Sequence, residues 1–140
     1  MNNLEDILEK AKSAFVAGDT QTAFEIWKPL AEKGNAKAQN NFGIMYKEGK
    51  GVPQDYKEAI KWYRLSAEQG VAEAQHNLGR KYYKGQGVPQ DYLLAHMWWD
   101  LSGSNGYKDA VKGRNIVEKK MTPSQIEKAQ EMARNWKPKK

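Results

Sequence analysis

Gly49-Lys50-Gly51-Val52-Pro53-Gln54-Asp55-Tyr56 is the stretch that decides the fold, because it returns thirty-six residues later as Gly85-Gln86-Gly87-Val88-Pro89-Gln90-Asp91-Tyr92. The glycines at the first and third positions permit positive φ and end the preceding helix, and the proline disfavours helix just before it. The aspartate then starts a new helix as its N-cap. The same helix-loop-helix signal at a fixed period predicts a repeat protein.

The similarity extends to both sides of this loop. Residues 38–73 and 74–109 are identical at 17 of 36 positions. A period of this length with helical spacing of apolar residues predicts stacked helix pairs. Small residues at Gly43 and Gly79 are expected to let helices approach closely. A third copy, at about 3–35, has its loop shortened to a tight turn at Gly18-Asp19, and Pro29 should kink its second helix.

The whole pattern predicts an all-α fold, a solenoid of about three helix-pair repeats with a C-terminal capping helix pair. Thr122-Pro123-Ser124-Gln125 has the spacing of a capping box, and the apolar stripe after it should cover the last repeat, followed by a frayed tail. We expect helices at 3–17, 20–33, 36–48, 55–69, 72–84, 91–104, 107–120 and 123–136. Residues 1–140 should form a single helical-repeat domain, with repeats at about 3–35, 36–71 and 72–106 and the cap at 107–137.

Composition narrows the class of protein. With five Trp and seven Tyr, the chain is too aromatic to be disordered. With 39% hydrophobic and 29% charged residues, it is too polar for a membrane span. The absence of cysteine excludes disulfides, thiolate metal sites and a cysteine nucleophile. Met1 to Lys12 lacks the pattern of a secretory signal, which favours a cytoplasmic location. A secreted or periplasmic location stays open if a leader has been removed.

Positive charge is concentrated at the C-terminal end. Residues 1–107 hold 13 basic and 13 acidic side chains, whereas 108–140 hold 10 basic and 4 acidic ones. This end is either a solubilising face or a patch for nucleic acid or an acidic surface. Its candidate residues are Lys112, Arg114, Lys119, Lys120, Lys128, Arg134, Lys137, Lys139 and Lys140.

No catalytic or metal constellation is evident, and we expect no cofactor and no enzyme activity. The two histidines, His76 and His96, lack a second ligand at metal-binding spacing, and His96 should be packed in the core. The glycine loops lack the order of a phosphate-binding loop and follow no strand. The tryptophans recur at core positions of second helices, which favours packing over base stacking.

The run from Ala38 through Asn41, Tyr46 and the glycine loop to Trp62 resembles the Sel-one-like repeat, a relative of the tetratricopeptide repeat. The resemblance implies a right-handed α/α superhelix whose first helices line a concave surface. It also implies an adaptor or scaffold role in binding proteins or peptides. The family's secreted branch is rich in disulfides, which this chain cannot form.

The resemblance also places the binding site on the concave face. Asparagine amides there would both donate to and accept from a peptide backbone, and Arg80 would offer a fork to an acidic group. The candidates, all expected to be exposed, are Lys37, Asn40, Asn41, Ile44, Lys47, Glu73, His76, Asn77, Arg80 and Tyr83. Three alternatives remain open: these are ordinary surface residues, the basic end binds nucleic acid or an acidic surface, or an incompletely covered repeat face makes the monomer a weak dimer.

Overall fold

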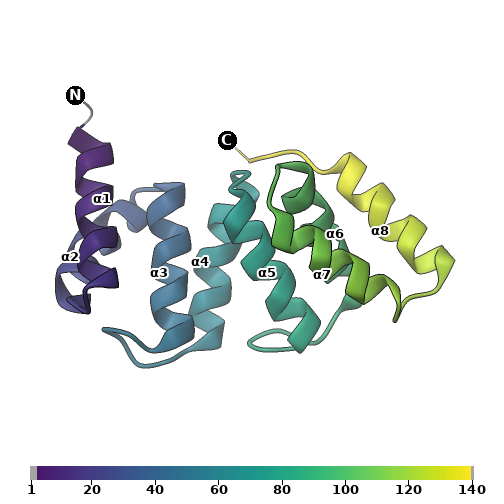
Figure 1. Cartoon of the computed structure of the whole chain (residues 1–140), viewed down its shortest axis with the longest axis horizontal. Coiled ribbons are helices and arrows are strands. Elements are labelled where there is room, and N and C mark those ends of the chain that lie inside the picture. The colour runs from purple at the N-terminus through teal and green to yellow at the C-terminus, as the bar shows by residue number, and fades with distance from the viewer. Residues whose placement is uncertain (1–2, 140) are drawn as a thin grey trace.

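A computed structural model describes residues 3–139, and over this range the chain forms eight α-helices and no strand (Figure 1). The predicted all-α fold is confirmed, and every expected helix is present with ends that differ by one or two residues at most. The helices are α1 (Asn3–Val16), α2 (Thr20–Glu32), α3 (Ala36–Glu48), α4 (Tyr56–Glu68), α5 (Ala72–Lys84), α6 (Tyr92–Ser104), α7 (Lys108–Glu118) and α8 (Pro123–Asn135).

The helices stack in chain order. Helices α1 and α2, α3 and α4, and α5 and α6 form antiparallel pairs, and each pair packs on the next through α2 with α3 and α4 with α5. Figure 1 shows the array running from α1 to α8, and most packing is between helices adjacent in the chain. The packing of α8 on α6 and a smaller contact of α7 with α5 join helices that are not adjacent. This nearest-neighbour packing is what defines a solenoid.

Local sequence signals explain where the helices begin and end. Gly49 and Gly85 end α3 and α5 in the left-handed conformation, with φ of 67° and 68°. Asp55 and Asp91 cap α4 and α6 by accepting backbone N–H bonds. Helix α2 continues through Pro29 to Glu32. The expected roles of the loop glycines and aspartates are therefore confirmed.

The glycine loops also connect successive repeats. Gly51, at φ 78°, lies against Thr20 at the start of α2, and Gly87, at φ 81°, lies against Tyr56 at the start of α4. Thr20 and Tyr56 are thirty-six residues apart, so the same contact is made twice. Each loop thus packs on the repeat before it.

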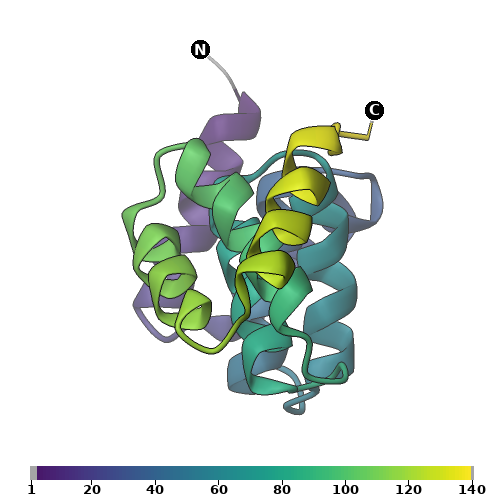
Figure 2. The same ribbon diagram turned by 90° about the vertical axis from the view of Figure 1, so that its right-hand side faces the viewer.

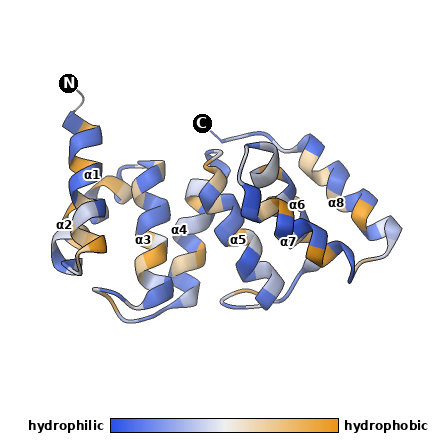
Figure 3. Cartoon of the chain, viewed as in Figure 1, coloured by the Kyte–Doolittle hydropathy of each residue, from blue (hydrophilic) through white to orange (hydrophobic). Residues whose placement is uncertain are grey.

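Aromatic rings fill the space that small residues leave. A Cβ on Gly43 would lie 2.8 Å from the ring of Tyr63, and one on Gly79 would lie 2.9 Å from the ring of Trp99. Gly113 of α7 also packs on Trp99, which explains a glycine in the middle of that helix. Figure 3 shows apolar and hydrophilic residues alternating along the helices, as amphipathic packing requires.

The C-terminal helices cover the last repeat as expected. Helices α7 and α8 both pack on α6, and Figure 2 shows them diverging from the turn that joins them. The ring of Trp136 meets Trp98 edge-on, with centroids 6.1 Å apart. The expectation of a frayed tail is wrong for Lys139. Its backbone N–H donates to the Glu68 carbonyl at 2.7 Å because the chain after α8 reaches the C-terminal end of α4. Lys140 lies outside the described residues.

Candidate functional site

The inner side of α1 and α3, with the start of α5, forms a hollow that we call the concave groove. It encloses about 700 Å³. Its α3 wall consists of positions spaced by three and four residues, which lie on one helical face. Leu8, Phe15 and Ile44 supply apolar surface between charged side chains. The full lining is Glu5, Leu8, Glu9, Lys12, Phe15, Val16, Trp27, Lys37, Asn40, Asn41, Ile44, Val71 and Glu73.

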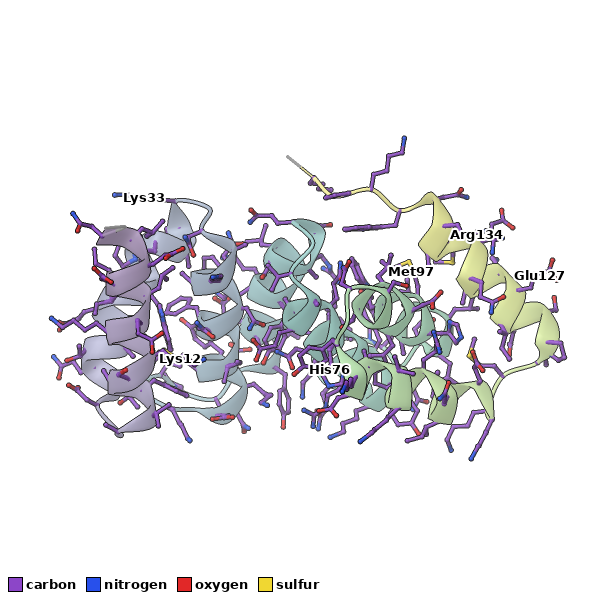
Figure 4. All side chains as sticks on the ribbon, turned by 45° about the horizontal axis from the view of Figure 1, so that its top comes forward. Lys12, Lys33, His76, Met97, Glu127 and Arg134 are labelled. Carbon is purple, nitrogen blue, oxygen red and sulfur yellow. The ribbon has the colours of Figure 1, made fainter. Side chains whose placement is uncertain are left out.

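The groove brings together half of the predicted site residues. Those that line it are Lys37, Asn40, Asn41, Ile44 and Glu73. Lys47 and Arg80 instead line a second hollow, while His76, Asn77 and Tyr83 line neither. Sequence reasoning missed the contribution of α1, whose Leu8, Lys12 and Phe15 face α3; Figure 4 shows Lys12 extending from α1 toward that helix. The helical period of α1 alone does not tell which of its faces meets α3.

Asn40 is buried, contrary to expectation, with 2% of its surface exposed. Its Nδ2 donates to Glu73 Oε2 at 2.9 Å, and its Oδ1 accepts from Asn77 Nδ2 at 3.1 Å. Because α5 packs beside α3, these polar groups of successive repeats reach one another. Asn40 and Asn77 therefore bond each other, whereas the side chain of Asn41 forms no hydrogen bond within the described residues.

His76 is also less exposed than expected, at 9%. Its ring lies 4.9 Å from that of Tyr107, just before α7, and 6.2 Å from that of Trp99 (Figure 4 places His76 beside α7). Burial, and next the charge of Arg80, lower the pKa of His76 to about 4. Tyr83 likewise packs on Tyr92 and Trp99. Tyr107, at the start of the cap, thus covers His76 of the third repeat, whereas no residue of the cap lines the groove of the first two repeats.

The second hollow lies between the two glycine loops and encloses about 460 Å³. We call it the basic hollow. Its lining is Lys47, Glu48, Lys50, Gln54, Tyr56, Arg80, Lys81, Lys84 and Gln86. Sequence reasoning missed it because residues 1–107 carry balanced charge. The basic residues in the last turns of two equivalent helices were the available signal.

The basic C-terminal end is partly paired. Arg114 Nη1 lies 3.0 Å from Asp100 Oδ1, and Lys139 Nζ lies 3.0 Å from Glu68 Oε2. His96 is fully buried, as expected, and its Nε2 lies 2.7 Å from Glu118 Oε2. Two of the candidate cations and one histidine therefore contact carboxylates of the chain itself.

Neither a metal centre nor a membrane helix is found in the part of the chain that the structure describes. Between residues 3 and 139, no three His, Asp or Glu side chains lie close enough together to hold a metal ion. None of the helices in that range combines the length and apolar character that crossing a membrane requires.

Comparison with known proteins places the chain in a family. The Sel1 repeat model matches residues 36–71 and 72–107. A protective antigen of uropathogenic Escherichia coli strains, whose structure displays an SLR fold, is 34% identical with a TM-score of 0.90; the match covers 95% of this chain and 29% of that one. A Sel1 repeat protein from Oxalobacter formigenes is 31% identical with a TM-score of 0.72, over 79% of this chain and 45% of that one.

The chain thus spans less than half the length of either solved structure. No curated protein matches it. Two family repeats, the glycine loops between their helices, and the shared fold lead to one conclusion: this chain is a right-handed α/α solenoid and belongs to the Sel1 repeat family.

Proposed function

We propose that this chain is a noncatalytic protein-interaction module that holds an extended segment of a protein partner in the concave groove. Sel1 repeats generally mediate protein–protein interaction. The observation that carries the proposal is the groove itself, which stays open where the cap does not reach. It combines apolar surface with the unbonded side-chain amide of Asn41, which is what an extended peptide needs.

The side chains of α3 suggest how the segment is held. Asn41 is half-exposed, lines the groove and has a free amide, which suits one N–H and one C=O of a peptide backbone. Ile44, one turn further along α3, faces Leu8 and Phe15 across the groove and would contact an apolar side chain of the partner. Asn40 and Asn77 bond each other and would support the groove wall.

The test begins with affinity capture of the partner from native lysate, followed by calorimetry with the purified partner. Asn41→Ala should weaken binding by about 1–3 kcal/mol without lowering the melting temperature, because no internal bond is lost. Ile44→Ala should weaken it comparably. Asn115→Ala, on the exposed face of α7, is the matched control. Full binding by the Asn41→Ala/Ile44→Ala double variant would move the interaction to another face.

A further inference from the structure

The basic hollow gathers more positive than negative charge. Lys47, Lys50, Arg80, Lys81 and Lys84 line it together with a single carboxylate, that of Glu48. Glu48 lies 3.2 Å from Lys50 Nζ and 3.8 Å from Lys47 Nζ. Within residues 3–139, no carboxylate lies within ion-pairing distance of Arg80, Lys81 or Lys84.

The negative ends of the neighbouring helices offset only part of this positive charge. Helices α3 and α5 both end at the hollow, and a helix C-terminus carries about half a negative charge. With Glu48, this gives about two negative charges against five positive side chains. A net excess of about three positive charges remains in one concave site.

One of the cations is buried. Lys81 has 3% of its surface exposed, its Nζ donates to Gln86 Oε1 at 2.7 Å, and it lies 4.8 Å from the centre of the Tyr56 ring. Burying an ammonium group without a counter-ion is unfavourable, and the pKa of Lys81 falls to about 8 through burial and the neighbouring cations. A bound anion would offset this cost.

The basic hollow adjoins the concave groove. Ile44 lines the groove and Lys47 lines the hollow one turn later on α3, a rise of about 4.5 Å. Lys50 Nζ, in the hollow, lies 5.5 Å from the centre of the Phe15 ring, in the groove. From Asn40 to Lys47, α3 advances about 10 Å, which an extended peptide covers in about three residues.

We infer that the basic hollow binds carboxylate side chains of the partner held in the groove, so that the partner carries an acidic run within about three residues of an apolar side chain. This inference rests on the proposed function. It explains why a repeat body of balanced charge concentrates its cations beside the groove, where they would orient the bound segment and speed its association.

The probe is a blocked, fluorescently labelled peptide of two leucines, two glycines and four glutamates, measured by fluorescence anisotropy at low ionic strength. Replacing its glutamates by glutamine should weaken binding about tenfold. Arg80→Gln/Lys84→Gln should weaken binding of the glutamate peptide by a similar factor. The charge-matched control, Lys120→Gln/Arg134→Gln, changes exposed residues of the C-terminal end and should leave affinity unchanged.

The outcomes separate the hollow from the groove. Equal weakening by both double variants, or no binding of the glutamate peptide, overturns the inference. If the glutamate and glutamine versions of the peptide bind equally well, the result supports the groove proposal and contradicts the inference about the basic hollow. If replacing the leucines by serine leaves the affinity unchanged while binding still depends on Arg80 and Lys84, the result supports the basic hollow as a binding site and contradicts the groove proposal. Equal melting temperatures of the two variants confirm that folding is not the cause.

Discussion

At the scale of single residues, the loop glycines differ in what surrounds them. Gly70, at φ 95°, has open space where a Cβ would lie. A Cβ on Gly51 would first meet two side-chain atoms, the end of Met45 at 2.9 Å and the Cβ of Thr20 at 3.0 Å, whereas one on Gly87 would meet the backbone oxygen of Tyr56 at 2.7 Å. Backbone cannot move aside as a side chain does, so equivalent glycines carry different costs.

This difference predicts a graded loss of stability on substitution by alanine. Gly70→Ala should cost about 1–2 kcal/mol through positive φ alone. Gly51→Ala should cost somewhat more, and Gly87→Ala most, because the clash with Tyr56 adds to the backbone strain. Urea unfolding of the three variants checks the order. Equal losses at all three positions would contradict a packing role for the loops.

The burial of His76 predicts a pH dependence of stability. Its pKa is lowered from 6.5 to about 4, so the unfolded chain takes up this proton first as the pH falls. The free energy of unfolding therefore has its full value, as far as His76 is concerned, above about pH 6.5. It falls progressively between about pH 6.5 and pH 4, by at most about 3 kcal/mol. Urea unfolding across this range should show a steeper loss for the wild type than for His76→Gln. Parallel profiles of the two proteins would contradict a neutral, buried His76.

At the scale of elements, the two full repeats form equivalent hydrogen bonds as well as equivalent helices. Ser66 Oγ of α4 donates to the Ala36 carbonyl, and Ser102 Oγ of α6 donates to the Ala72 carbonyl, both at 2.7 Å. Helix α6 differs from α4 in what covers it, because α7 and α8 replace a further repeat. The cap is thus a substitute neighbour for the last pair.

Removing residues 122–140 should therefore expose the face of α6 that α8 covers, including Trp98 and Met97. We expect a lower melting temperature and a dimer or aggregate, measured by calorimetry and light scattering. The control removes only 137–140 and loses the Lys139 contacts with Glu68, at a cost of about 1 kcal/mol or less. A monomeric 1–121 fragment of unchanged stability would show that α8 stabilises nothing.

At the scale of the whole molecule, the core divides into two clusters. One joins the first helix pair to α3 and α4 and contains Trp27, Phe42 and Trp62. The other runs from α4 to α8 and contains Tyr63, Trp98 and Trp99. Tyr46 packs against both. In such a linear arrangement, stability is local to each pair and its neighbours.

Native-state hydrogen exchange should reveal this division. Amides of α1 and α2 should exchange faster than those of α4 to α6, because the first pair has a neighbour on one side only. Mass spectrometry of peptides from each helix measures the difference. Uniform protection along the chain would indicate a single cooperative unit instead.

Sequence alone determined the features that depend on nearby residues. Helix ends follow from glycine, proline and aspartate within a few positions, and the period of thirty-six residues shows that the pairs stack. The α3 side of the groove was predicted because helical spacing puts Asn41 and Ile44 on one face. These signals act over short distances along the chain, so they are visible without coordinates.

Only the tertiary structure decided which remote side chains meet. The bond between Asn40 and Asn77, the turn of Lys139 back to Glu68, and the covering of His76 by Tyr107 join residues that lie thirty or more positions apart. The basic hollow is of the same kind, since charges that balance along residues 1–107 separate once α3 and α5 lie side by side. Electrostatic energy depends on distance in space, and the fold alone sets that distance.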